Sequence, residues 1–173
     1  MFTMKKLAGV IAAVAISSSA YAVDPTASVV WNGMVPGSTG GDTIMITGLA
    51  GGAIGGGTLV VASGGSFTSS TIILEAHENT GTAASPVAGD ITTAKWTLSS
   101  ALVNYTTASA DSAELKVFND SDPIAWEVGT DLGDVAGSGI ETLRLTVSQG
   151  VDVGTISGEL VQVQVTVVAA QNV

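Results

Sequence analysis

Residues 159–170 read ELVQVQVTVVAA, and this stretch decides the fold class. In an extended chain, successive side chains point to opposite faces. One face of this stretch would carry Val161, Val163, Val165 and Val167. The other face would carry Gln162, Gln164 and Thr166. Such a period of two is typical of a β-strand that buries one face, so the run predicts a long strand with its valines in a core.

The same alternation recurs along the chain, whereas helical periodicity is nearly absent. The run ETLRLTV places three apolar side chains inward: Leu143, Leu145 and Val147. Further strands are predicted at residues 42–48, 58–63, 67–80, 94–100, 113–120 and 124–128. Clusters of Gly, Pro, Asp and Ser between them are typical of turns. Seven to nine short strands of this kind predict an all-β, antiparallel sandwich in a single domain.

The first 22 residues have the features of a secretory signal peptide. Lys5 and Lys6 precede an apolar stretch at 7–16, and Ala20-Tyr21-Ala22 provides a small-x-small cleavage sequence. The apolar stretch is too short for a permanent membrane span. We therefore expect an exported protein whose mature chain begins at Val23.

The composition of the expected mature chain restricts its partners. Lys95, Lys116 and Arg144 are its only basic residues against 15 acidic ones, which gives a net charge of −12. Binding to a phosphate backbone requires clustered Lys and Arg. We therefore do not expect the chain to bind nucleic acid or anionic membranes. The chain has no cysteine. Its stability must therefore come from burial and backbone pairing, or from a neighbour that completes the core.

Residues 48–57 read GLAGGAIGGG, a density of glycine that raises the possibility of a phosphate-binding loop. Such a loop needs a following lysine and a helix N-terminus. Here the next basic residue after Lys6 is Lys95, and the loop is followed by TLVV, a β-branched strand. We interpret these glycines as turn or bulge residues, or as positions where another backbone comes close.

A search for catalytic or metal-binding residues finds little, and we expect no enzyme, no cofactor and no metal site. The single histidine, His77, falls on the face opposite Leu74 and Ala76, which predicts an exposed side chain. Asp120 and Asp122 precede Pro123, where Asx turns explain them without a ligand, although a weak calcium site stays open. No Gly-x-Ser-x-Gly nucleophile motif is present. The three tryptophans are expected in core or interface positions: Trp31, Trp96 and Trp126.

The segment after the expected cleavage site, VDPTASVVWNGMVPG, alternates small and large apolar residues. One face would carry Ala27, Val29 and Trp31. The other would carry Ser28, Val30 and Asn32. A terminal strand can pair with its own sheet or with the exposed edge of another molecule, so both interpretations stay open.

Two stretches resemble the chaperone–usher pilins of Gram-negative bacteria, in particular the cysteine-free branch with the common pilus and CFA/I-type major subunits. Residues 27–48 are similar to the first region of that family, in which a strand with a tryptophan is followed by a polar break and a second strand. Residues 156–167, ISGELVQVQVTV, are similar to its last strand. The chain lacks the disulfide and the C-terminal tyrosine of type 1-like pilins, which separates it from that branch.

The resemblance implies an incomplete immunoglobulin-like antiparallel β-sandwich that a neighbouring subunit completes by donor-strand exchange. Residues 23–35 would be the donor extension and 36–173 the pilin domain. The donor side chains would be Ala27, Val29 and Trp31. The acceptor groove would be lined by Leu143, Leu145, Val147, Val161, Val163, Val165 and Val167. The implied partners are other copies of the chain, a periplasmic chaperone and an outer-membrane usher, on the route to an adhesive or biofilm fibre at the cell surface. A self-contained secreted binding or matrix protein is the alternative.

Overall fold

The computed structural model describes residues 27–31, 43–82, 84–106, 110–119, 124–132, 139–156 and 158–171. Within these ranges the chain consists of antiparallel strands and two short 3-10 turns, which confirms the all-β prediction. The expected signal peptide, residues 1–22, lies outside them. No helix in the described part of the chain has the length and hydropathy needed to cross a bilayer.

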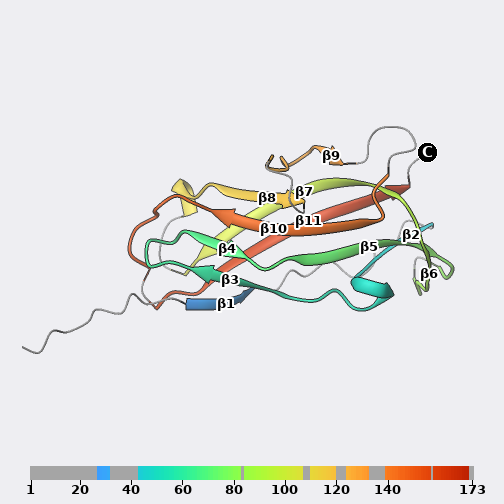
Figure 1. Cartoon of the computed structure of the whole chain (residues 1–173), viewed down its shortest axis with the longest axis horizontal. Helices are drawn as coiled ribbons and strands as arrows, with labels where there is room; N and C mark the ends of the chain where they lie inside the picture. The colour runs from blue at the N-terminus through green and yellow to red at the C-terminus, as the bar shows by residue number, and fades with distance from the viewer. Residues whose placement is uncertain are drawn as a thin grey trace, which may run out of the picture.

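The strands follow one another along the chain as shown in Figure 1. The first six are β1 (Ala27–Trp31), β2 (Ile44–Thr47), β3 (Gly57–Val61), β4 (Phe67–Ser69), β5 (Ile72–Asn79) and β6 (Ala88–Ile91). The remaining five are β7 (Ala94–Tyr105), β8 (Leu115–Asn119), β9 (Asp131–Leu132), β10 (Thr142–Gln149) and β11 (Val161–Gln171). The 3-10 turns are η1 (Leu49–Gly51) and η2 (Ala110–Ser112).

The larger sheet is built around β4 and β5, which follow each other along nearly one line. On one side of that line β3 pairs with β4 and β2 pairs with β5. On the other side β10 pairs with both strands through its two halves, and β8 pairs with β10. The sheet is extended by β6 on β5 and by β1, which pairs with β3. All of these pairs are antiparallel.

The smaller sheet contains β11, β7 and β9 in that order. The long strands β7 and β11 pair over eleven positions, from Val161 opposite Tyr105 to Gln171 opposite Ala94, with one irregularity at Thr166 and Val167. Figure 1 shows these two strands crossing behind the larger sheet, inclined to its strands. The two sheets therefore form two layers.

The core lies between the two layers and consists of aliphatic and aromatic side chains from both. Trp96 and Leu98 of β7 are fully buried, as are Leu59 of β3 and Leu143 of β10. All four valines of the odd-numbered face of β11 are buried, while Gln162 and Gln164 are exposed. This is the alternation that the sequence predicts for the last strand.

Buried hydrogen bonds connect the strands at one end of the core. The Tyr105 hydroxyl donates to the carbonyl of Gly65 at 2.9 Å, and the Gln149 amide donates to the Tyr105 oxygen at 3.1 Å. Tyr105 belongs to the smaller sheet and Gln149 to the larger one. Because the chain has no cysteine, this polar cluster, rather than a disulfide, links the two layers here. Burial raises the pKa of Tyr105, so its hydroxyl stays protonated and able to donate.

Four expectations about strands need correction. Residues 67–80 form two strands, β4 and β5, instead of one. Residues 124–128 do not form a strand, because the only pairing there is an isolated bridge between Trp126 and Val117. Strand β7 extends to Tyr105, five residues beyond the predicted end. The short strands β6 and β9 were not predicted, since each consists of a few residues without clear alternation. Trp96 and Trp126 are buried, as expected for core tryptophans.

Two leucines of β7 provide a test of this core. Leu98 is 0% exposed and Leu102 is 56% exposed, although both lie on the same strand. We expect Leu98→Ala to lower the free energy of unfolding by about 2–5 kcal/mol, because it leaves a cavity between the layers. Leu102→Ala should change it by less than about 0.5 kcal/mol. Urea denaturation followed by tryptophan fluorescence measures both, and equal losses would contradict the placement of the core.

Candidate functional site

One long edge of β11 has no partner strand in the described part of the chain. The smaller sheet ends at β11, which pairs with β7 on one side only. Exposed edges present unpaired N–H and C=O groups to other strands, and natural proteins protect them with charges, prolines or bulges. Between Val161 and Gln171 there is no charged residue and no proline. The edge of β11 is therefore suited to accept another strand.

The N-terminal segment lies beside this edge but pairs with the other sheet. Every residue of β1 has a partner in β3, from Ala27 opposite Val61 to Trp31 opposite Gly57. The Cα trace of β1 also comes within 8 Å of β11, although no ladder joins the two strands. The segment thus lies between β3 and β11, held by its own chain. This is the arrangement expected if the first strand completes its own sandwich.

The proposed donor residues stay a prediction. Ala27, Val29 and Trp31 alternate along β1, but their side chains are outside the description, as is Asn32 of the competing register. The pairing with β3 places the backbone of β1.

The proposed acceptor residues are all buried, and they come from two different places in the fold. Val161, Val163, Val165 and Val167 lie on the edge strand β11. Leu143, Leu145 and Val147 lie on β10, which is in the interior of the larger sheet between β4 or β5 and β8. Instead, β1 and β2 of the larger sheet each have several Cα atoms within 8 Å of β11. The sequence did not predict this proximity, because it does not give the order of strands.

His77 is not exposed, which corrects the expectation from sequence. Its residue surface is 8% exposed and that of Glu75 is 6% exposed. Both side chains lie on the outward face of β5, where η1 covers His77, and Gly89 of the neighbouring strand β6 contacts it. The His77 Nδ1 atom is 2.9 Å from the carbonyl oxygen of Gly89, and Nε2 is 3.1 Å from Glu75 Oε2. The backbone N–H of Gly51 donates to the same Glu75 oxygen at 3.3 Å.

This arrangement favours a protonated imidazole. Both ring nitrogens of His77 face oxygen acceptors, and only the imidazolium form has two donors. The Gly89 carbonyl and then Glu75 raise the pKa of His77 above its usual range, against the effect of burial, and Asp90 of β6 acts in the same direction. The hydrogen bond from His77, with a further one from Gly51, lowers the pKa of Glu75. The ion pair therefore fastens η1 and β6 to β5.

The glycine-rich loop has the structural role that the sequence predicts for it. The Gly48 N–H donates to the carbonyl of Gly52 at 2.8 Å and closes a tight turn around η1. A Cβ atom at Gly48 would collide with the Ala53 carbonyl. Gly51 has φ of +72° and lies over the His77 ring, with 3.8 Å from its Cβ position to Cε1. The loop covers the Glu75–His77 pair and needs glycine to do so.

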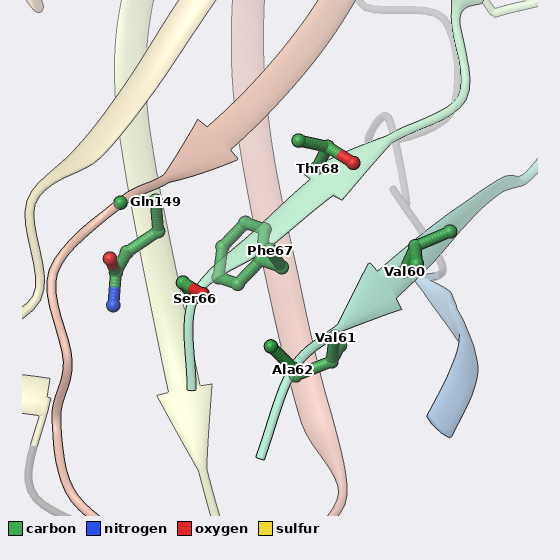
Figure 2. Close-up of a pocket in the computed structure, with 8 residues that line it drawn as sticks. Val60, Val61, Ala62, Ser66, Phe67, Thr68 and Gln149 are labelled. Atoms are coloured by element: carbon green, nitrogen blue, oxygen red, sulfur yellow. The ribbon is translucent and has the colours of Figure 1, made fainter. Parts of the chain in front are cut away.

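The described residues contain no cluster of three or more His, Cys, Asp or Glu residues that could hold a metal ion. Asp120 and Asp122, the candidates for a weak calcium site, lie outside the described ranges. A hollow of about 350 Å³ lies at the ends of β3, β4 and β10 (Figure 2). It is lined mainly by Val60, Val61, Ala62 and Phe67, and the amide of Gln149 beside it is already engaged by Tyr105 and Gly65.

No protein-family model, curated protein or solved structure matches this chain.

The Glu75–His77 pair predicts a specific dependence of stability on pH. A raised pKa of His77 stabilises the fold fully below about pH 6.5, and this contribution is lost as the pH rises through the folded pKa. The lowered pKa of Glu75 contributes above about pH 4.5 and is lost as the pH falls through its folded value. The contribution of the pair should therefore be largest between these two pH values. We expect the stability difference between the native chain and His77→Gln to shrink from pH 6 to pH 9.

Imidazole NMR titration measures the pKa of His77 directly, and urea denaturation at each pH measures the stability. Glu78→Gln is the matched control, because Glu78 is the exposed neighbour on the same strand. A folded pKa of His77 at or below 6.5 would contradict the geometry.

Proposed function

We propose that this protein is a structural subunit of a bacterial surface pilus that polymerises by donor-strand complementation. The observation that carries the proposal is the unpaired edge of β11 in the described part of the chain, eleven residues long and without charge or proline. An edge of this kind is a template for strand addition. The proposal agrees with the resemblance to chaperone–usher pilins, because residues 161–167 of the resembling stretch belong to β11.

Burial of the donor strand supplies the free energy for such a contact between two subunits. A donor strand beside β11 would extend the smaller sheet and add its inward side chains to the valine face. Full burial of a valine-sized side chain contributes about 1.5–3 kcal/mol, and a backbone ladder adds to it. Since the contact joins two different surfaces head to tail, repetition gives an open fibre.

The position of β1 indicates how strand exchange between two copies could take place. In a single copy the segment pairs with its own β3, next to the edge of β11. Residues 32–42 connect it to the next described segment, and eleven residues can span up to about 40 Å when extended. In a fibre the segment 23–35 would leave its own sheet and occupy the equivalent place in the next copy, an exchange of identical elements. A periplasmic chaperone would cover the edge before the usher adds the subunit to a fibre on the surface of a Gram-negative cell, where it supports adhesion or biofilm formation.

The pairing of β1 with β3 also favours a second candidate function. If the segment stays in its own sheet, the chain is a self-contained secreted binding or matrix protein, for example one that binds carbohydrate. Size-exclusion chromatography with light scattering distinguishes the two functions. A mature chain that stays a stable single copy without any partner supports the second candidate, and filaments support the first.

Two adjacent valines test the donor assignment, because they lie on opposite faces of the same strand. We expect Val29→Asp to prevent polymerisation of the mature chain, since the charge would enter the core. Val30→Asp is the matched control and should still polymerise. Negative-stain microscopy and sedimentation measure the outcome. The reverse result would move the donor register by one residue.

Deletion of residues 23–35 tests the segment as a whole. The shortened chain should form no filaments, and a synthetic peptide of residues 23–35 should bind to it. Filaments of the shortened chain would show that the donor is a different segment.

A further inference from the structure

The outer face of the smaller sheet carries no charge over most of its length. The side chains of β7 that point away from the core include Ser100, Leu102 and Asn104. On β11 they are Gln162, Gln164, Thr166 and Val168. We name these seven residues the neutral face. Cross-strand neighbours within it include Gln164 opposite Leu102 and Thr166 opposite Ser100.

This neutrality contrasts with the rest of a strongly acidic chain. No charged residue occurs in residues 96–110 or 160–173, so the net charge of −12 of the mature chain lies elsewhere. The outer face of the larger sheet presents Lys116 of β8 and Arg144 of β10, both exposed. At one end the neutral face is bounded by an ion pair between Lys95 and Asp131. The Lys95 Nζ atom is 3.2 Å from Asp131 Oδ2, so the two charges compensate each other.

We propose that the neutral face is a contact surface between two copies of this chain. Two molecules with a net charge of −12 repel each other, and an approach through this face keeps the acidic side chains of both copies apart. Sheets stack face to face at about 10 Å, and amide and hydroxyl side chains can then bond across the contact. Leu102 and Val168, 56% and 49% exposed, supply apolar surface to bury. No aromatic side chain lies on the face, which disfavours a sugar-stacking platform.

The size of the face determines the strength of this contact. The neutral face spans seven positions of β11, from Gln162 to Val168, which is about 23 Å along the strand, and two strands with their side chains are about 10 Å wide, which gives about 230 Å² per copy. Stable complexes bury about 800 Å² per partner, so single copies should associate weakly. Where many copies are aligned, as in the fibre proposed above, many such contacts would act together. The contact itself uses the face of the sheet and does not depend on exchange at its edge.

The experiment compares the mature chain with Gln164→Glu and Thr68→Glu. Each variant adds one negative charge at an exposed strand position, in the centre of the neutral face and on the outer face of the larger sheet respectively. Backbone amide shifts are followed by NMR from about 0.05 to 1 mM protein. For the native chain we expect concentration-dependent shifts at β7 and β11. Between about 0.01 and 0.15 M salt these shifts should grow, because the screening length falls from about 30 Å to about 8 Å.

Gln164→Glu should weaken the association by about tenfold or more, whereas Thr68→Glu should leave it near the native value. An equimolar mixture of Gln164→Glu and Gln164→Lys should restore it, since opposite charges then meet across the contact. If the mature chain polymerises, the same variants are compared by electron microscopy. Side-by-side pairing of filaments should be lost in Gln164→Glu while filament length is unchanged, which separates this contact from strand exchange.

Three results would overturn the proposal. The first is the absence of concentration-dependent shifts at β7 and β11 in the native chain, or of paired native filaments if it polymerises. The second is an equal loss of association in Gln164→Glu and Thr68→Glu. The third is a charge-swapped mixture that associates no better than Gln164→Glu alone.

Discussion

The ladder between β7 and β11 is the interaction on which the rest of the structure depends. Its eleven cross-strand pairs hold the valines of β11 in one row, and this row packs with Trp96 and Leu98 of β7 against the larger sheet. The chain has no disulfide to join its layers. The same ladder satisfies one edge of β11 and leaves the other without a partner in the described residues. Stability and the capacity for assembly thus come from one element.

The sequence predicted the elements that a period of two marks strongly. Strands β10 and β11 have long regular alternation, and their inward residues are buried as expected. Residues 124–128 are also apolar, but they make only one isolated bridge. Strand β6 depends on β5, and β9 on β7, for pairing, so their own few residues carry little signal.

The candidate site was predictable only in part, for a related reason. Alternation shows which side chains share a face, and it correctly placed His77 opposite Leu74. It does not show what covers that face. The cover is η1, whose Gly51 precedes His77 by 26 residues in the sequence. In the same way, alternation identified β11 as a strand with one buried face. It could not show that β11 ends its sheet, because strand order depends on contacts between distant segments.

The three tryptophans are distributed among the parts of this architecture. Trp31 ends β1, Trp96 lies in the smaller sheet, and Trp126 bridges to β8 of the larger sheet. Trp96 and Trp126 each donate their indole N–H to a backbone carbonyl, of Ile140 and Thr130 respectively. Each layer therefore contains its own optical reporter. With single-tryptophan versions of the chain, emission wavelength would show in which order the leading segment and the two layers come apart.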